Sequence, residues 1–166
     1  MVTLTLVSSG PADTAAIAEA VAPLLTQGDV VALSGELGAG KTRFVQGAAQ
    51  GLGITERVTS PTFVLMRHYE GRLSMVHVDV YRLDRLHDVD DLGDDVLAPD
   101  VVTFLEWSDA VESLLPEDRL DVEITVPVDL EAPRTVTLRG AGQTWRERAD
   151  MLTNATAPWR ADNEAP

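Results

Sequence analysis

The 166-residue sequence contains no cysteine, which excludes disulfides, thiolate metal ligands and cysteine nucleophiles. It also lacks a long apolar run, because no window approaches the roughly 18 consecutive apolar residues of a membrane-spanning helix. The first ten residues, MVTLTLVSSG, have neither the basic region nor the apolar core of a signal peptide. These absences predict a cytoplasmic protein in a reducing compartment, with no membrane segment.

Positively charged residues are scarce, since 13 Lys and Arg stand against 27 Asp and Glu, for a formal net charge of -14. Such a surface repels phosphate polymers and acidic membranes, so we expect no direct binding of nucleic acid by the chain alone. The basic residues are also too dispersed to form the arginine-rich lid that a small-molecule kinase would place over a transferring phosphoryl group.

Hydrophobic residues make up 45% of the chain, enough for one continuous core at this length. Periodicity is lost after Gly142, where the segment TNATAPWRADNEAP gathers Pro, Asn and Asp as frayed tails do. We therefore predict a domain over residues 1–142 and a C-terminal extension over 143–166, made of a short helix and then a flexible tail.

Strand and helix patterns alternate along the domain. The apolar runs at 29–35 and 101–107 have the continuous hydrophobicity of strands buried on both faces of a parallel sheet. Other strands are expected at 2–6, in a hairpin of 62–70 with 73–83, and in a closing hairpin of 118–128 with 134–140. Helices are expected from residue 13 to about 25, from Lys41 to about Leu52, and from an N-cap at Ser108. This order predicts an α/β fold of the P-loop NTPase-like type, a three-layer α/β/α sheet with a parallel centre and antiparallel edge strands.

The segment GELGAGKT matches the phosphate-binding pattern G-x-x-x-x-G-K-[ST] through Gly35, Gly40, Lys41 and Thr42, with Gly38 as an additional glycine. A predicted strand precedes this segment and a predicted helix follows it, as the pattern requires. The glycines let backbone N–H groups point inward at anionic phosphates. Lys41 would bridge the β- and γ-phosphates and the Thr42 hydroxyl would hold Mg²⁺, so the segment predicts a nucleoside triphosphate site.

Two carboxylates follow apolar strands and could hold or use the metal. Glu106 ends VVTFLE and Asp79 ends MVHVD. Alternatively, Glu106 caps the helix at Ser108 and Asp79 pairs with Arg82 or Arg85. The residues alone leave both alternatives open.

The segment TSPTF, residues 59–63, lies where P-loop switch proteins keep a loop that senses the γ-phosphate. Its Thr62 hydroxyl either completes the metal shell or belongs to the start of a strand, and both interpretations are equally supported. DDLG at 90–93 matches D-x-x-G, but no N-K-x-D guanine reader is present in the sequence, so GTP specificity is unsupported. The three histidines lack metal-ligand spacing and are interpreted as structural, while Trp107 fits a core or a partner surface.

GELGAGKT, TSPTF, HVDVYRL and FLEW, in this order, closely resemble the motifs of the TsaE (YjeE) family of small bacterial ATPases. The resemblance extends from the first predicted strand to about Arg139, and 143–166 has no clear counterpart in it. It implies a Mg²⁺-dependent ATPase that converts ATP to ADP and serves the formation of threonylcarbamoyladenosine in tRNA, beside the anticodon. It also implies homologues of TsaB and TsaD as partners, with tRNA reached only through their complex and hydrolysis slow without them.

Carried over by position, the resemblance implies a catalytic set of Lys41, Asp79 and Thr62, and Thr42 and Glu106 as metal ligands. Asp79 would act near the attacking water or the metal shell. The edge of the nucleotide would meet the opening of the first helix and a basic residue of the closing hairpin. The predicted nucleotide-binding residues are Thr14, Gly35, Gly38, Ala39, Gly40, Lys41, Thr42, Arg43 and Arg134.

Three functions are compatible with these motifs. The leading hypothesis is an ATPase that is slow alone and activated in a complex. The second is a nucleotide-gated binding module, in which ATP changes the TSPTF loop and partner affinity while hydrolysis only resets the complex. The third is a small-molecule kinase.

Overall fold

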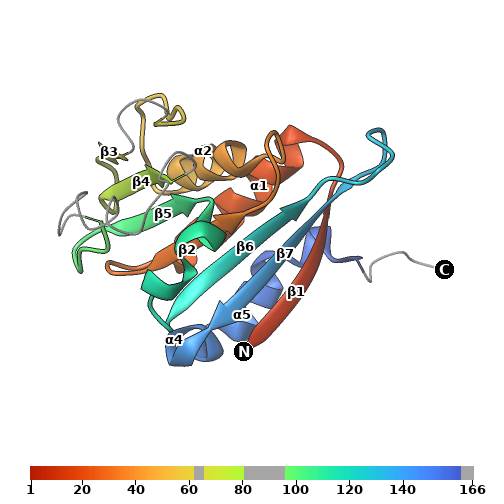
Figure 1. The fold of residues 1–166 in the computed structure, drawn as a ribbon. Coiled ribbons are helices and arrows are strands. Elements are labelled where there is room, and N and C mark those ends of the chain that lie inside the picture. The colour runs from red at the N-terminus through yellow and green to blue at the C-terminus, as the bar shows by residue number, and fades with distance from the viewer. Residues whose placement is uncertain (62–65, 81–95, 162–166) are drawn as a thin grey trace.

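A seven-stranded mixed sheet, in the order β1-β7-β6-β2-β5-β4-β3, is the centre of the part of the chain that the structure describes (Figure 1). The structure is a computed structural model, and it describes residues 1–61, 66–80 and 96–161. The strands are β1 (Val2–Ser8), β2 (Val30–Ser34), β3 (Met66–Tyr69), β4 (Met75–Asp79), β5 (Val102–Glu106), β6 (Arg119–Thr125) and β7 (Arg134–Ala141).

The centre of the sheet is parallel and its edges are antiparallel. Strand β2 pairs in parallel with β5 and β6, and β4 pairs in parallel with β5. Antiparallel pairs join β3 to β4, β6 to β7, and β7 to β1. Both β2 and β5 are buried along almost their whole length, as their continuous apolar runs predict. The predicted α/β class with a parallel centre is confirmed.

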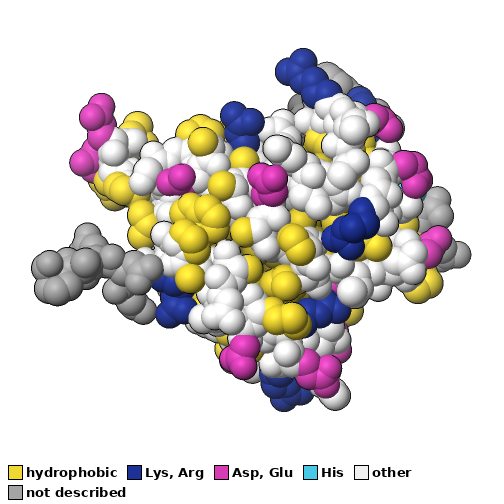
Figure 2. All heavy atoms as spheres, turned by 180° about the vertical axis from the view of Figure 1, so that it is seen from behind, with side chains coloured by type: hydrophobic (Ala, Val, Ile, Leu, Met, Phe, Trp, Pro, Cys, Tyr) yellow, Lys and Arg dark blue, Asp and Glu magenta, His cyan; other side chains and the backbone are white. Residues whose placement is uncertain are grey.

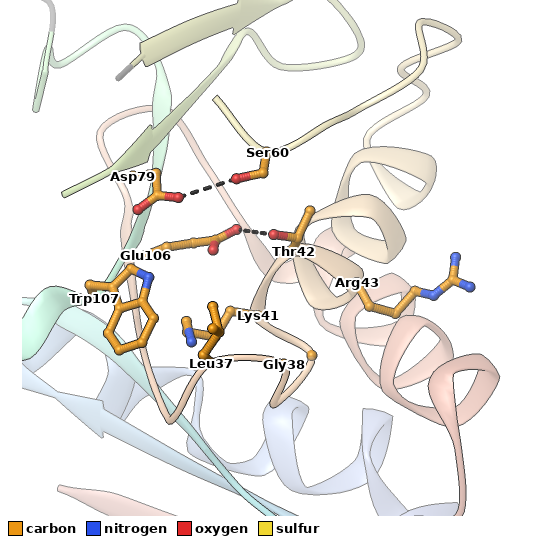
Figure 3. Close-up of a pocket in the computed structure, with 10 residues that line it drawn as sticks. Leu37, Gly38, Lys41, Thr42, Arg43, Ser60, Asp79, Glu106 and Trp107 are labelled. Carbon is orange, nitrogen blue, oxygen red and sulfur yellow. Dashed lines mark hydrogen bonds between the residues drawn. The ribbon is translucent and has the colours of Figure 1, made fainter. Parts of the chain in front are cut away.

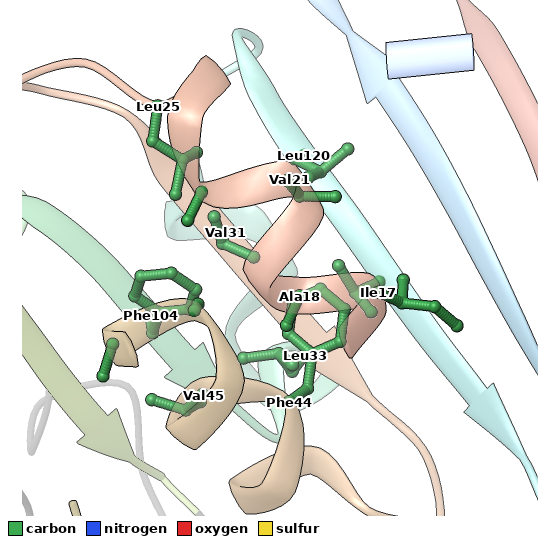
Figure 4. Packing of buried hydrophobic residues seen from close by; sticks show 14 of the residues in the cluster. Ile17, Ala18, Val21, Leu25, Val31, Leu33, Phe44, Val45, Phe104 and Leu120 are labelled. Carbon is green, nitrogen blue, oxygen red and sulfur yellow. The ribbon is translucent and has the colours of Figure 1, made fainter. Parts of the chain in front are cut away.

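Helices α1 (Pro11–Val21) and α2 (Lys41–Gly51) pack together on one face of the sheet (Figures 1 and 4). Helix α1 ends before Pro23, which lies in the 3₁₀ turn η1 (Ala22–Leu24) because proline lacks the N–H that would continue the helix. None of the helices in the described ranges is apolar and long enough to cross a membrane. The core between these helices and the sheet includes residues of both, namely Ile17, Ala18, Val21, Leu25, Val31, Leu33, Phe44, Val45, Phe104 and Leu120.

The opposite face of β4 and β5 carries a second, smaller apolar cluster, which includes Val76, Val78 and Leu105. The segment after β5 contributes Val111 to it from η2 (Ser108–Leu114). The predicted short helix is present here as the 3₁₀ helix η2, but the predicted N-cap at Ser108 is wrong, because Trp107 is the residue that precedes η2. The Trp107 backbone is left-handed, with φ 63°. The chain therefore changes direction at Trp107, and Ser108 is already the first residue of the 3₁₀ helix.

The C-terminal extension packs against the sheet as far as it is described. It contains α4 (Gly142–Glu147), α5 (Ala149–Ala155) and η3 (Ala157–Trp159). The Trp145 side chain is buried in the main core and lies over Gly140, where an added Cβ would come within 2.8 Å of Trp145 Cβ. A bridge between Leu6 and Arg160 joins the end of the extension to β1. The extension thus begins with helical structure, as expected, whereas the chain from Thr153 to Ala161 is ordered against the domain in place of the expected flexible tail.

Replacing Trp145 by alanine is expected to lower the free energy of unfolding by about 3–5 kcal/mol, because a large buried side chain would leave a cavity. Urea denaturation followed by circular dichroism measures this change. Met151→Ala in α5 is the matched control, since Met151 is 50% exposed, and its effect should stay within about 0.5 kcal/mol. Wild-type stability in the Trp145→Ala variant would contradict the packing of the extension.

Candidate functional site

A pocket of about 520 Å³ lies at the carboxyl ends of β2, β4 and β5 (Figure 3). Ligands of open α/β sheets bind at this edge, because the loops that follow parallel strands converge there. The pocket is lined by Leu37, Gly38, Gly40, Lys41, Thr42, Arg43, Ser60, Asp79, Glu106 and Trp107.

The loop between β2 and α2 depends on glycine at two positions. Gly35 has φ 140°, and an added Cβ would lie 2.5 Å from the Ile124 carbonyl oxygen. Gly40 has φ 118° and is the residue immediately before α2. Side chains other than glycine are strained in this region of φ, so the backbone requires the glycines that the motif supplies. The loop leads directly into the N-terminus of α2, where backbone N–H groups can bind an anion.

The Lys41 ammonium group occupies the base of this loop. Its Nζ donates hydrogen bonds to the carbonyl oxygens of Gly35, at 2.7 Å, and Glu36, at 2.9 Å. The same Nζ lies 3.8 Å from the centroid of the Trp107 ring, within reach of a cation–π interaction. The side chain is thus held inside the loop, and an incoming phosphate would have to draw it away from these partners.

Burial lowers the pKa of Lys41 below its ordinary value, because the charged ammonium loses solvation. Four carboxylates oppose this effect, with Glu106 and Asp79 contributing most and Asp109 and Glu36 contributing less. The loop therefore holds a cation whose lost hydration an anionic ligand would replace.

The two predicted carboxylates lie on neighbouring strands. Asp79 and Glu106 are paired in register at the ends of β4 and β5. The Thr42 hydroxyl donates to Glu106 Oε1 at 2.7 Å, and the Ser60 hydroxyl donates to Asp79 Oδ2 at 3.2 Å (Figure 3). The structure therefore brings Thr42, Asp79 and Glu106 together at the mouth of the loop.

This donor set fits Mg²⁺, which prefers carboxylate and hydroxyl oxygens. In nucleotide sites the ion is usually held by one or two side chains, with phosphate oxygens and water completing six ligands. Thr42 and Glu106 could supply the protein ligands, with Asp79 close by. Among residues 1–61, 66–80 and 96–161, no group of three or more His, Cys, Asp or Glu side chains is placed to hold a metal by itself.

On the other side of the loop, Arg134 and Thr14 border Gly40. Arg134 Nη1 donates to the Ala39 carbonyl oxygen at 2.6 Å. An added Cβ at Gly40 would lie 3.3 Å from Arg134 Nη1 and 3.7 Å from Thr14 Cγ2. Thr14 is itself hydrogen-bonded to Ser8, with 2.7 Å between their hydroxyl oxygens. Both residues are thus beside the predicted phosphate cradle, although they are far apart in the sequence.

One predicted residue, Arg43, stands apart from this cluster, and a second is not described. Arg43 is part of the pocket lining, but its side chain points away from Lys41 and Glu106 in Figure 3. Its Nη1 donates a hydrogen bond to Gln46 Oε1 at 3.2 Å. Thr62 lies outside the described residues.

The sequence interpretation missed the roles of His77 and Trp107 in the site. His77 is completely buried, and its Nε2 lies 2.8 Å from Glu106 Oε1. A signal was present, because His77 and Asp79 are two residues apart on one strand and therefore face the same side. The contact between His77 and Glu106 can be inferred from it only once β4 is known to lie beside β5.

Trp107 emission is expected to change when ATP and Mg²⁺ are added, because Lys41 would leave the indole ring to reach the phosphates. Stopped-flow or steady-state fluorescence measures this response, and Trp107→Phe should remove it while Trp145 and Trp159 continue to emit. An unchanged response in Trp107→Phe would contradict the contact between Lys41 and Trp107.

Known proteins resemble the chain over most of its length. A sequence model of the family described as "Threonylcarbamoyl adenosine biosynthesis protein TsaE" matches residues 8–134. A relative from Treponema pallidum, named tRNA threonylcarbamoyladenosine biosynthesis protein TsaE, is 46% identical over 74% of this chain and 92% of its own length. A relative of the same name from Bacillus subtilis is 42% identical over 86% of this chain and 89% of its own length.

The fold also has a solved counterpart in the crystal structure of Bacillus subtilis YdiB. The two structures superimpose with a TM-score of 0.74 and 34% identity, covering 94% of this chain and 95% of the other. This coverage is more than residues 1–142 can supply, so the likeness reaches into the extension at 143–166.

Proposed function

The chain belongs to the TsaE family of tRNA threonylcarbamoyladenosine biosynthesis proteins, and from this premise we propose that it is a Mg²⁺-dependent ATPase that supports formation of this modified nucleoside. The observation that carries the proposal is the convergence of Lys41, Thr42, Asp79 and Glu106 at the end of a glycine loop. A cation, a hydroxyl and two carboxylates at one helix N-terminus match what a triphosphate with Mg²⁺ requires.

In this proposal Lys41 gives up its bonds to the loop carbonyls and binds the β- and γ-phosphates, where negative charge develops during cleavage. Mg²⁺, when bound, would neutralise charge on the phosphate oxygens. Thr42 and Glu106 would hold the ion. Asp79, held by Ser60, would orient the attacking water by accepting a hydrogen bond from it. The products are ADP and inorganic phosphate.

The proposed partners are homologues of TsaB and TsaD, with tRNA reached only through their complex. The net charge of -14 supports this indirect contact, because the chain alone would repel RNA. Figure 2 shows the face covered by α1 and α2, on which the Lys and Arg side chains are scattered among apolar and acidic ones.

A nucleotide-gated binding module is the second candidate function. The observation that favours it is the hydrogen bond from Ser60, within TSPTF, to Asp79 Oδ2. This bond links the loop to a carboxylate of the pocket lining, so nucleotide occupancy could change the loop and with it the affinity for a partner.

Formation of threonylcarbamoyladenosine in tRNA, measured with TsaB and TsaD homologues, separates the two functions. ATP should support many rounds per complex, whereas ADP and a non-hydrolysable ATP analogue should support at most one. Repeated rounds with the analogue would favour the binding module over the ATPase. Transfer of labelled γ-phosphate to a small acceptor, in place of its release, would favour a kinase.

A further inference from the structure

His77 lies in β4, beside the proposed metal ligand Glu106, and does not itself line the pocket. Its imidazole has 0% exposure, and the strand register places it next to Phe104. An imidazole surrounded by apolar residues loses solvation, and this loss is offset only where the ring is hydrogen-bonded. The contact of 2.8 Å between His77 Nε2 and Glu106 Oε1 supplies that bond.

The hydrogen on His77 can be assigned from its partner. An ionised carboxylate only accepts hydrogen bonds, so Nε2 is the donor. Thr42 Oγ1 donates to the same Glu106 oxygen at 2.7 Å. The other ring nitrogen, Nδ1, is buried and has no hydrogen-bond partner within the described part of the chain. A side chain present only to fill the core would not introduce this unsatisfied nitrogen, so the ring is best explained by the bond it makes to Glu106.

We propose that His77 is a positioning residue, which holds Glu106 Oε1 through Nε2–H and so fixes the rotation of the carboxylate that binds Mg²⁺. Because Thr42 bonds the same oxygen, the two protein ligands are held together before the ion arrives. Glu106 is 3% exposed, so water cannot readily take the place of the imidazole. The inference rests on the proposed function, since His77 acts only through Glu106.

The test compares the affinity of a non-hydrolysable ATP analogue in Mg²⁺ with its affinity in EDTA, both measured by isothermal titration calorimetry. The ratio of the two affinities is the contribution of Mg²⁺. In His77→Leu this ratio should fall by about tenfold or more, as is usual when a partner of a metal ligand is removed. The affinity in EDTA should stay near that of the wild type. His77→Gln, whose amide can donate from nearly the same position, should keep the ratio within about threefold.

Thr103→Val is the matched control. Thr103 Oγ1 is also buried on a central strand without a hydrogen-bond partner among the described residues, so the substitution tests for a general effect of altering a buried polar group. It should leave the ratio unchanged. Thermal unfolding establishes that each variant folds. If His77→Leu does not fold, His77→Asn, whose shorter amide cannot reach Glu106, should show the same loss.

Two results would overturn the inference. One is that a folded His77→Leu or His77→Asn variant, which lacks the donor to Glu106, keeps the wild-type ratio of affinities in Mg²⁺ and in EDTA. The other is an equal loss of affinity in Mg²⁺ and in EDTA, which would make His77 structural only. A wild-type protein whose affinity does not depend on Mg²⁺ would instead contradict the proposed function, so the two failures are distinguishable.

Discussion

Replacing Lys41 by alanine is expected to lower ATP hydrolysis by at least about a hundredfold, because one preorganised donor to a developing charge contributes that much. The expectation is stronger for Lys41 than for a surface lysine, since Lys41 is 5% exposed and its ammonium lies within the loop, where Glu106 and Asp79 act on its charge. Release of inorganic phosphate, measured with homologues of TsaB and TsaD present, is the assay.

The control for Lys41→Ala is Arg139→Ala. Arg139 is also cationic, but it pairs with Glu123 across β6 and β7, outside the pocket lining. Its loss should change phosphate release by less than about twofold, as for a surface ion pair. Equal losses in the two variants would indicate a general charge effect and would contradict a specific role for Lys41.

Replacing Lys41 lowers the expected activity, but it should not lower the stability of the protein without nucleotide. Because folding lowers the pKa of Lys41, the charged side chain is a cost to the folded state. This cost is fully present below the pKa of the folded state and disappears as the pH rises toward the ordinary value. Lys41→Met should therefore unfold at the same or a higher temperature than the wild type near neutral pH, and the difference should shrink at alkaline pH. A lower melting temperature for Lys41→Met than for the wild type near pH 7 would contradict the expectation that the charged Lys41 side chain destabilises the folded state.

Removing the Glu106 carboxylate is expected to have a comparable effect on activity. Glu106→Ala should lower phosphate release by about a hundredfold or more, because it deletes a proposed metal ligand and leaves the Thr42 hydroxyl without its acceptor. Glu106→Gln keeps the size but loses the charge, so it should retain the fold and still need a much higher Mg²⁺ concentration for half-maximal rate.

Glu123→Ala is the control for the Glu106 variants, since it removes a carboxylate of β6 whose partner is Arg139. Its phosphate release and its dependence on Mg²⁺ should match those of the wild type. Near-normal turnover in Glu106→Ala would rule out Glu106 as the metal ligand.

The sequence alone could predict the phosphate loop because all its parts are contiguous. Gly35, Gly40, Lys41 and Thr42 lie within one strand–loop–helix unit, and backbone sterics dictate where glycine must stand. Asp79 and Glu106 could be placed as strand-end carboxylates for a similar reason. The register that puts them side by side is a long-range property of the sheet.

Local sequence patterns did not predict the features that depend on contacts between distant segments. Thr14 and Arg134 meet at Gly40 from opposite ends of the domain, and only the family resemblance suggested them. His77 was interpreted as structural, because its contact with Glu106 exists only once β4 and β5 are paired. Trp145 is buried because Gly140 leaves room for its ring, which no periodicity within the extension reveals.

The most direct test of the central claim is the release of inorganic phosphate from ATP by the wild-type chain, measured with homologues of TsaB and TsaD, in Mg²⁺ and in EDTA. The proposal predicts that phosphate is released in Mg²⁺, that the partners increase its rate, and that EDTA or Lys41→Ala abolishes it. No release in Mg²⁺ with both partners present, or release that Lys41→Ala leaves unchanged, would contradict it.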